Sequence, residues 1–578
     1  MQPAVLGLNW AWYFCQGYNS TVIDTWRLLN SKSGRFPGGT GASFWDWENG
    51  VLLNESQIGE CLQARGLPTN CTSVHDCSDT CACDGPRQPL CEEAAKSAQG
   101  PLSAERIYRE FYAQVGVKEM VWQPNLFFDW RNQSMNWLHS AMTAYGAPLP
   151  LVELGNEHYL DSYELMMPTA ADYVGVAAPV AAAVQSAGGQ VGLTAEPCGP
   201  LEGAAAAAWK LRSDPRRALW NANMSAAAAA RGVVADAWVL HSYTLGGVPL
   251  NETDDEANWG TAWLLYAEAS LSNAREYVTA LASEETQIWL TEYGASSPCV
   301  PWPTCEIPPG KEHKKSAWVR DAIYSPAHAI ALIGVPLHAL ATPSARITAA
   351  NLHAVFAPFY EARGLVEVLP RAGPAGADAL NVSVLAQLFS HFSSVARRAD
   401  SVRSLSLDGA SRLALNFSVG GRRNFSAVAA LGLAREADAA AASREDFVLV
   451  NRGPQQLSLA IGVRVAGLRF KLSAYASDQP TRTAGFSVID PHRPPELPWP
   501  GPMPVGVGSA RSAACARAEP QAEPQAEPQA EPQAEPQAEP QAEPCLQLKL
   551  APLSLLLVEE VEEDGAYVSA GPSPRPVE

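Results

Sequence analysis

Over residues 1–395, short apolar runs alternate with longer stretches whose apolar residues recur at helical spacing. The helical stretches include residues 170–186, 262–283 and 316–333. Strands that alternate with helices form a parallel sheet, because each crossover returns the chain to the same edge. Eight such strands predict a (β/α)8 barrel, with a doubly wound sheet as the alternative. The predicted strands are Val5–Ala11, Arg35–Phe36, Met120–Leu126, Leu149–Leu154, Val191–Ala195, Ala237–Leu240, Ile288–Leu290 and Pro336–Leu340.

The pattern changes after residue 395, where apolar runs become shorter, alternate with polar residues and are separated by turn residues. This is typical of an antiparallel β-sandwich, which we place at residues 396–565. Within it, at residues 518–544, the triplet Ala-Glu-Pro recurs seven times with Gln between the copies. Proline at every fourth position prevents a regular helix, so we expect a disordered insertion there and a disordered tail at residues 566–578.

Cysteines and glycosylation sequons indicate an oxidising compartment. Six of the twelve cysteines lie between Cys61 and Cys91, within a predicted insertion at about residues 55–95. They lack repeated Cys-x-x-Cys pairs at zinc-finger spacing, so we expect disulfides rather than a metal site. A further disulfide is expected between Cys515 and Cys545, at the base of the repeat. Nine Asn-x-Ser/Thr sequons predict N-glycans and favour a secreted or extracellular protein.

The start of the chain lacks the basic and long apolar segments of a signal peptide, and we interpret it as a mature or truncated N-terminus. No apolar run of about 18 residues is present, so no transmembrane helix is expected. The net charge of −19 argues against a nucleic-acid partner, because phosphate binding needs a basic face. The glycine-rich segment Gly34–Gly41 has neither a phosphate-loop nor a dinucleotide pattern, so no cofactor is expected.

Two of the predicted barrel strands end in a glutamate. The fourth runs into Gly155-Asn156-Glu157, and the seventh runs into Glu292. Catalytic residues of (β/α)8 barrels lie at the carboxyl ends of strands. Retaining glycosidases need two carboxylates roughly 5–5.5 Å apart, one as acid/base and one as nucleophile. We therefore expect Glu157 and Glu292 to face each other at the barrel mouth.

These motifs are similar to those of the clan A retaining glycoside hydrolases. In that clan the acid/base follows an Asn at the end of strand 4, as in Asn156-Glu157, and the nucleophile ends strand 7, as Glu292 does. The closest patterns are those of the heparanase/β-glucuronidase and α-L-arabinofuranosidase families. The resemblance implies hydrolysis of a poly- or oligosaccharide by double displacement. It also implies that Asn156 binds the sugar 2-hydroxyl.

The same resemblance extends to the second and sixth strands. Arg35-Phe-Pro-Gly-Gly-Thr40 resembles a strand 2 motif in which an Arg supports the nucleophile. His241-Ser-Tyr243 resembles the clan's His-x-Tyr, whose Tyr hydroxyl bonds the nucleophile. This implies that Arg35 and Tyr243 stabilise the charged form of Glu292. His241 is interpreted as a residue that orients a partner or touches the sugar, with a purely structural histidine as the alternative.

The chain departs from the clan at strand 8, which usually ends in a Trp that forms a sugar platform. The predicted strand Pro336–Leu340 has no Trp, so Trp10 and Trp122 are candidates for this role, with Trp12 and Trp302 as further choices. Two other glutamates lie in or directly after predicted barrel strands. Glu153 precedes the strand 4 motif and is interpreted as structural, and Glu196 ends the fifth strand and is a rival catalytic residue. The alternative function is a catalytically inactive carbohydrate-binding glycoprotein on the same fold.

Overall fold

The architecture is described from a computed structural model. It describes residues 3–9, 20–53, 55–67, 104–107, 114–128, 135–137, 151–160, 163–164, 166–196, 215–243, 265, 268, 271–272, 274–294, 326–353, 355, 365–369, 379–405, 412–417, 421–435, 444–453, 455–463, 469–476, 487–489, 506–511, 513–515 and 543–561. The predictions for Trp10, Trp12 and Trp302 lie outside these residues. So do most of the cysteine-rich insertion, residues 518–542 of the repeat and the tail at 566–578.

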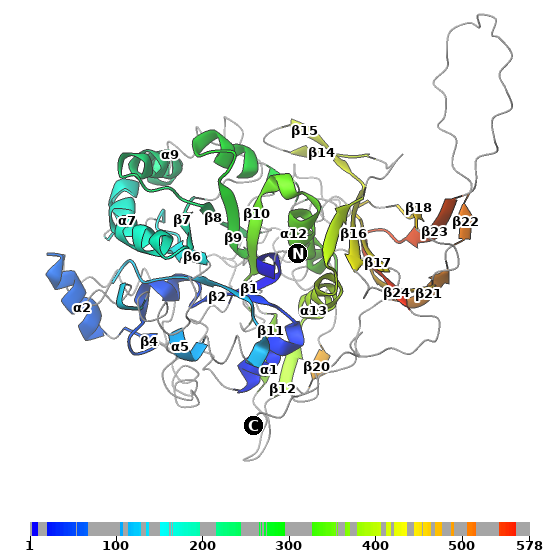
Figure 1. Cartoon of the computed structure of the whole chain (residues 1–578), viewed down its shortest axis with the longest axis horizontal. Coiled ribbons are helices and arrows are strands. Elements are labelled where there is room, and N and C mark those ends of the chain that lie inside the picture. Colours follow the sequence, from blue (N-terminus) through cyan, green and yellow to red (C-terminus); the bar gives the residue numbers. More distant parts are fainter. Residues whose placement is uncertain are drawn as a thin grey trace, which may run out of the picture.

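Eight parallel strands close into a barrel in the first part of the chain, as predicted (Figure 1). Each strand pairs with its neighbours in parallel register, and the last strand pairs with the first. The strands are β1 (Gly7–Asn9), β2 (Ser33–Phe36), β5 (Glu119–Trp122), β6 (Leu151–Leu154), β7 (Gln190–Thr194), β8 (Ala237–Tyr243), β9 (Gln287–Gly294) and β10 (Ile347–Leu352).

Helices surround the barrel and bury its outer face. Figure 1 shows α7 and α9 beside β6, β7 and β8, with α12 and α13 between the barrel and the second domain. The main helices are α1 (Ser20–Leu29), α2 (Glu55–Ala64), α5 (Ala104–Ile107), α7 (Ala170–Ser186), α9 (Pro215–Ala230), α12 (Pro326–Ala341) and α13 (Val384–Arg397). A small hairpin of β3 (Trp45–Asp46) and β4 (Val51–Leu52) follows β2. Among the described helices, none has both the length and the apolar character needed to cross a membrane.

The eighth strand is not where the sequence placed it. Pro336–Leu340 belongs to α12, and the strand that closes the barrel is β10, Ile347–Leu352. The prediction was wrong because α12 is buried on nearly all sides, from Ala329 to Leu340. A short run that is apolar throughout has no period, so a buried helix and a buried strand look the same in sequence.

Side chains that point into the barrel form an apolar floor below a polar mouth. The floor is a separate cluster to which β5, β6, β8, β9 and β10 contribute. Gly192 of β7 completes it, because a Cβ there would lie 2.7 Å from the ring of Trp289. The residues of this floor are Val121, Leu151, Ala237, Val239, Trp289 and Ala349.

The C-terminal part contains antiparallel sheets, as predicted. A six-stranded sheet has the order β13 (Ser401–Ser404), β16 (Val428–Arg435), β17 (Arg444–Asn451), β24 (Ser554–Val561), β19 (Arg469–Ala476), β21 (Gly506–Arg511). A three-stranded sheet has the order β18 (Leu457–Gly462), β23 (Glu543–Leu550), β22 (Ala513–Cys515). Residues of both sheets, among them Phe447, Leu449, Leu546 and Leu548, share one apolar cluster, which makes the pair a sandwich.

Two smaller sheets contain the remaining described strands. One is the hairpin of β14 (Arg412–Phe417) and β15 (Gly421–Ser426). The other joins β11 (Val366–Leu369) and β12 (Ala379–Val382) to β20 (Ser487–Ile489). Strand β23 begins at Glu543, so the last two residues of the predicted disordered repeat are in fact a paired strand. Cys515 and Cys545 lie on the neighbouring strands β22 and β23, and the disulfide between them stays a prediction.

Candidate active site

Glu157 is presented by a tight turn that follows β6. Gly155 has φ 98° and Glu157 has φ 46°, so the chain reverses through two left-handed residues. Gly155 has no room for a side chain, because a Cβ there would lie 2.1 Å from Cε1 of His158. Gln123 Nε2 donates to the Gly155 carbonyl at 2.8 Å, and Tyr159 Oη donates to Glu157 Oε1 at 3.2 Å. The turn thereby directs Glu157 back over the barrel mouth.

Glu292 is directed into the mouth by a bulge in β9. A step of two residues on each neighbouring strand is matched by a step of three on β9. On β8, Val239 and His241 pair with Trp289 and Glu292. On β10, Ala350 and Leu352 pair with Leu290 and Tyr293. Side chains of a regular strand alternate, so an extra residue reverses the alternation beyond it. Glu292 therefore faces the interior, as Trp289 of the floor does.

Arg35 of β2 lies fully buried beneath the two glutamates and holds several acceptors at once. Its Nε and Nη2 donate to the two oxygens of Glu153, at 2.7 and 2.6 Å. Its Nη1 donates to Glu292 Oε1 at 2.5 Å, and Nη2 also reaches Asn156 Oδ1 at 2.8 Å. Burial disfavours the charged guanidinium, but Glu153 and Glu292 outweigh it and raise the pKa of Arg35. Arg35 is thus a permanent cation below the mouth.

His241 and Tyr243 project from β8 between the glutamates. Tyr243 Oη donates to Glu292 Oε2. His241 Nδ1 lies 2.8 Å from Glu157 Oε1 and 3.6 Å from Glu292 Oε2, and Nε2 lies 3.2 Å from Thr291 Oγ1. Burial alone would lower the pKa of His241, but Glu292 and Glu157 outweigh it and raise the pKa to about 10. A protonated His241 therefore bridges both carboxylates at neutral pH.

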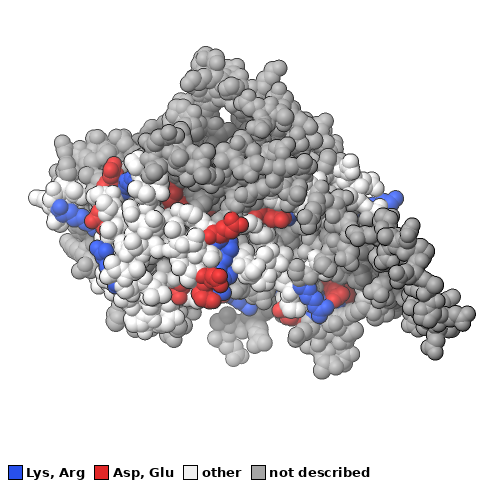
Figure 2. All heavy atoms as spheres, turned by 90° about the horizontal axis from the view of Figure 1, so that it is seen from above, with Lys and Arg blue, Asp and Glu red and all other residues white. Residues whose placement is uncertain are grey.

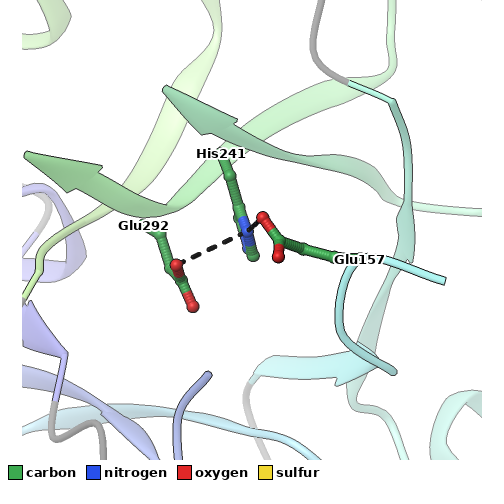
Figure 3. A group of neighbouring side chains, drawn as sticks. All are labelled: Glu157, His241 and Glu292. Atoms are coloured by element: carbon green, nitrogen blue, oxygen red, sulfur yellow. Dashed lines mark hydrogen bonds and ion pairs between the residues drawn. The ribbon is translucent and has the colours of Figure 1, made fainter. Parts of the chain in front are cut away.

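The two candidate carboxylates are close together. An oxygen of Glu157, a ring nitrogen of His241 and an oxygen of Glu292 all lie within 4.8 Å of one another. Figure 3 shows the three side chains close together, Glu157 from the turn after β6, His241 from β8 and Glu292 from β9. The separation fits the retaining class, where the carboxyl groups are roughly 5–5.5 Å apart, and not the inverting class at about 6.5–9.5 Å.

The environments of the two glutamates differ. Burial opposes the ionisation of Glu292, but His241, His353 and Arg35 hold its pKa far below the ordinary value. Its side chain is 5% exposed, whereas that of Glu157 is 21% exposed. Glu292 is therefore a fixed anion, while Glu157 faces solvent and contacts only His241 and Tyr159 among the hydrogen bonds described for it.

The same three groups are close enough to be metal ligands, since each offers one ligand atom. However, Glu292 already accepts hydrogen bonds from Arg35 and Tyr243. His241 Nδ1 likewise already lies within hydrogen-bond distance of Glu157 Oε1, at 2.8 Å. The hydrogen bonds that these groups already make therefore argue against a metal site.

Sequence analysis did not identify every residue of the site. His353, just beyond β10, lies with its Nδ1 4.0 Å from Glu292 Oε2 and 2.9 Å from Asn9 Nδ2 of β1. Gln123 follows β5 and donates to the turn that holds Glu157. Each is a polar residue at the carboxyl end of a barrel strand, and that position alone could have marked it. His353 was hidden because the eighth strand was misplaced.

Other predicted residues lie elsewhere. Trp122 is 1% exposed and packs against Phe36, Trp47 and Trp137, so the described structure places it in a core cluster rather than on an open surface. The end of β10 also lacks a Trp and carries His353 instead.

Two further candidates are explained by their partners. Glu196 receives two hydrogen bonds from Arg217, at 3.1 and 2.8 Å, and is therefore the partner of a cation at the rim. The Asn156 side chain is buried, with its oxygen accepting from Arg35.

Comparison with known proteins identifies the fold. No protein-family model matches the chain, and no curated protein matches it by sequence. Among solved structures it is similar to a family 51 α-L-arabinofuranosidase from Bifidobacterium longum, with 15% identity, a TM-score of 0.55, and 97% of this chain and 96% of that chain covered. It is also similar to the arabinose complex of an α-L-arabinofuranosidase from Thermotoga maritima, with 13% identity, a TM-score of 0.50, and 94% and 91% covered. The chain thus has the barrel-and-sandwich fold of the clan A glycoside hydrolases.

Proposed function

We propose that the protein is a retaining glycoside hydrolase with Glu292 as nucleophile and Glu157 as acid/base. The observation that carries this proposal is that two neighbouring carboxylates have different hydrogen-bond donors. Arg35 and Tyr243 both donate to Glu292, and neither of the hydrogen bonds described for Glu157 comes from them. One carboxylate is kept ionised for attack, and the other is paired with a histidine through which a proton can be exchanged.

The first step forms a glycosyl-enzyme. An oxygen of Glu292 attacks the anomeric carbon while the bond to the leaving oxygen breaks, and Glu157 gives that oxygen a proton. Glu292 becomes a neutral ester, and the negative charge passes to the Glu157–His241 pair. His241 lies 2.8 Å from Glu157 and 3.6 Å from Glu292, so it faces the charge both before and after the transfer.

The second step reverses these roles. Glu157, now a carboxylate, takes a proton from water, and the resulting hydroxide equivalent displaces Glu292 from the anomeric carbon. Two inversions give net retention. The 21% exposure of the Glu157 side chain is consistent with a group that must meet both leaving group and water.

The similar folds and the composition suggest a substrate class. The two structures named above are α-L-arabinofuranosidases, so arabinofuranosides are the first substrates to test, with other pentosides and uronides next. Figure 2 shows Lys and Arg beside Asp and Glu on the described part of one face, which is not the basic surface that a nucleic acid needs. Nine sequons and twelve cysteines support action outside the cell on a polysaccharide or glycoconjugate.

The test is azide rescue on nitrophenyl glycosides. An activated leaving group needs little protonation, so Glu157→Gly should form the glycosyl-enzyme and accumulate it. Azide should then restore turnover and give a glycosyl azide of retained configuration. In Glu292→Gly, azide should attack the sugar directly and give the inverted product.

Two outcomes contradict the proposal. Exchanged azide products would mean that the two roles are reversed. A wild-type protein that binds sugars but hydrolyses none of the glycosides would be an inactive binder on the same fold.

A further inference from the structure

Arg35 serves two carboxylates that differ in their part in the reaction. It binds Glu153 with two parallel hydrogen bonds, through Nε and Nη2, and Glu292 with one. Both Arg35 and Glu153 are completely buried. Arg35 therefore makes its stronger, two-bond interaction with Glu153 beneath the site and not with Glu292 at the mouth.

The proposed reaction would otherwise leave Arg35 without a partner. When Glu292 becomes an ester it loses its charge, and the negative charge appears on the pair of Glu157 and His241. His241 contacts both positions, but no hydrogen bond or ion pair described for Arg35 reaches Glu157. A buried guanidinium that loses its only counter-ion is strongly destabilised. With Glu292 as its only anion, Arg35 would therefore oppose formation of the glycosyl-enzyme.

We propose that Glu153 is the permanent counter-ion of Arg35, a positioning residue that lets Glu292 give up its charge while Arg35 stays in place. This inference rests on the proposed function. It assigns a role in the first chemical step to a residue that touches neither substrate nor the reacting atoms, and that the sequence alone marks as structural.

The surroundings of Glu153 suit a fixed anion. Gln123 Nε2 donates to Glu153 Oε1 at 3.2 Å, and His241 Nε2 lies 3.8 Å from the same oxygen. Burial opposes ionisation, but Arg35 and His241 outweigh it and keep the pKa of Glu153 below its ordinary value. Each neighbour is a donor, so Glu153 stays ionised in every state of the cycle.

The kinetic test uses Glu153→Gln, which keeps the shape and removes the charge. Glycosylation, measured as kcat/KM and as the rate of labelling by a 2-fluoro glycoside, should fall about 100-fold, as when one strong electrostatic contact is lost. Reactivation of the 2-fluoroglycosyl-enzyme should be unchanged or faster, because the free carboxylate of Glu292 then gains all of Arg35. A residue with only a structural role would slow both steps, and that result would overturn the proposal.

Two variants control this measurement. Glu153→Asp keeps the charge and should recover at least about tenfold of the lost glycosylation rate. Glu559→Gln removes another buried carboxylate, bound to Arg398 of the barrel–sandwich junction, and should leave both rate constants unchanged. A loss of glycosylation in Glu559→Gln equal to that in Glu153→Gln would show that destabilisation alone explains the effect.

A second measurement needs no activity. Glu292→Gln mimics the neutral ester, and with Glu153 present it should fold with little change in Tm. In the double variant with Glu153→Gln, Arg35 has neither carboxylate, and Tm should fall at least about 3 °C below the sum of the two single effects. Additive effects would overturn the proposal. A wild-type protein without glycosidase activity but with this coupling would refute the proposed function alone.

Discussion

Two buried clusters of charged side chains, one at the barrel mouth and one at the junction of barrel and sandwich, are built from the same residue types. At the junction, Glu559 of β24 accepts from His391 of α13 and from Arg398, with Lys471 Nζ 3.9 Å away. His391 Nδ1 also bonds Tyr475 Oη of β19. At the mouth, the corresponding histidine and arginine face three glutamates.

The clusters differ in the ratio of carboxylates to basic side chains. At the junction, one carboxylate, that of Glu559, lies among three basic side chains. Burial opposes its ionisation, but His391, Arg398 and Lys471 outweigh burial and lower the pKa of Glu559 to about 2. At the mouth, three carboxylates lie around Arg35 and His241, with His353 4.0 Å from Glu292. In the proposed reaction the negative charge leaves Glu292 when its ester forms and appears on Glu157 when that group gives its proton to the leaving oxygen.

The largest difference is expected in catalysis. Glu292→Gln removes the proposed nucleophile and should lower kcat/KM by at least about 10⁴-fold. Glu559→Gln should leave kcat/KM within about twofold, because distant sites act independently. Steady-state kinetics on an activated aryl glycoside compare the two directly. Equal losses in both variants would remove the distinction between the clusters.

The tyrosines give a second pair. Tyr243→Phe removes a donor to Glu292 and should reduce kcat by roughly 100-fold, as loss of one donor in an electrostatic site does. Tyr475→Phe removes a donor from His391 and should cost about 1 kcal/mol of stability without changing kcat. An unchanged kcat in Tyr243→Phe would show that this hydroxyl does not stabilise the nucleophile.

Stability should show the reverse order. Glu559→Gln leaves Arg398 and His391 without their carboxylate and should cost about 2 kcal/mol, less than a fully buried pair because the side chain of Arg398 is 35% exposed. Glu292→Gln should cost less than about 1 kcal/mol, since Arg35 keeps Glu153. Denaturant unfolding of the two variants measures this, and a greater loss in Glu292→Gln would contradict it.

The smallest effect concerns a histidine for which no carboxylate contact is described. His158 packs among Phe127, Tyr163 and Tyr173, and burial, with Arg216, lowers its pKa to about 3. The unfolded chain takes up a proton near pH 6.5, so this group makes the folded state lose stability as the pH falls from 6.5 toward 3. Relative to pH 7.5, His158→Leu should reduce the loss at pH 5 by about 1 to 2 kcal/mol, measured by urea unfolding at both pH values. An identical loss in wild type and variant would mean that other groups cause the acid sensitivity.

The main features of the fold were predictable because they depend on local pattern. Seven of the barrel strands overlap the ranges predicted from the sequence, and both candidate glutamates follow predicted strands. The eighth strand was predicted at the wrong place because α12 is apolar on all sides and has no helical period in the sequence. Asn9 and His353 were missed because a single polar residue at a strand end carries no pattern of its own. The pairing of Arg35 with Glu153 depends on two strands 118 residues apart, which no local spacing encodes.

The bulge in β9 has a consequence for how this site can change over time. Loss of one residue between Trp289 and Glu292 would restore the regular alternation and leave Glu292 facing the interior, because residues two apart in a regular strand lie on one face. The same loss between Val239 and His241 of β8 would turn His241 toward the surrounding helices, because that strand has no extra residue to give up. A three-nucleotide deletion is therefore expected to be tolerated at the bulge of β9 and not at the facing part of β8. A deletion scan of the two strands would measure that asymmetry directly.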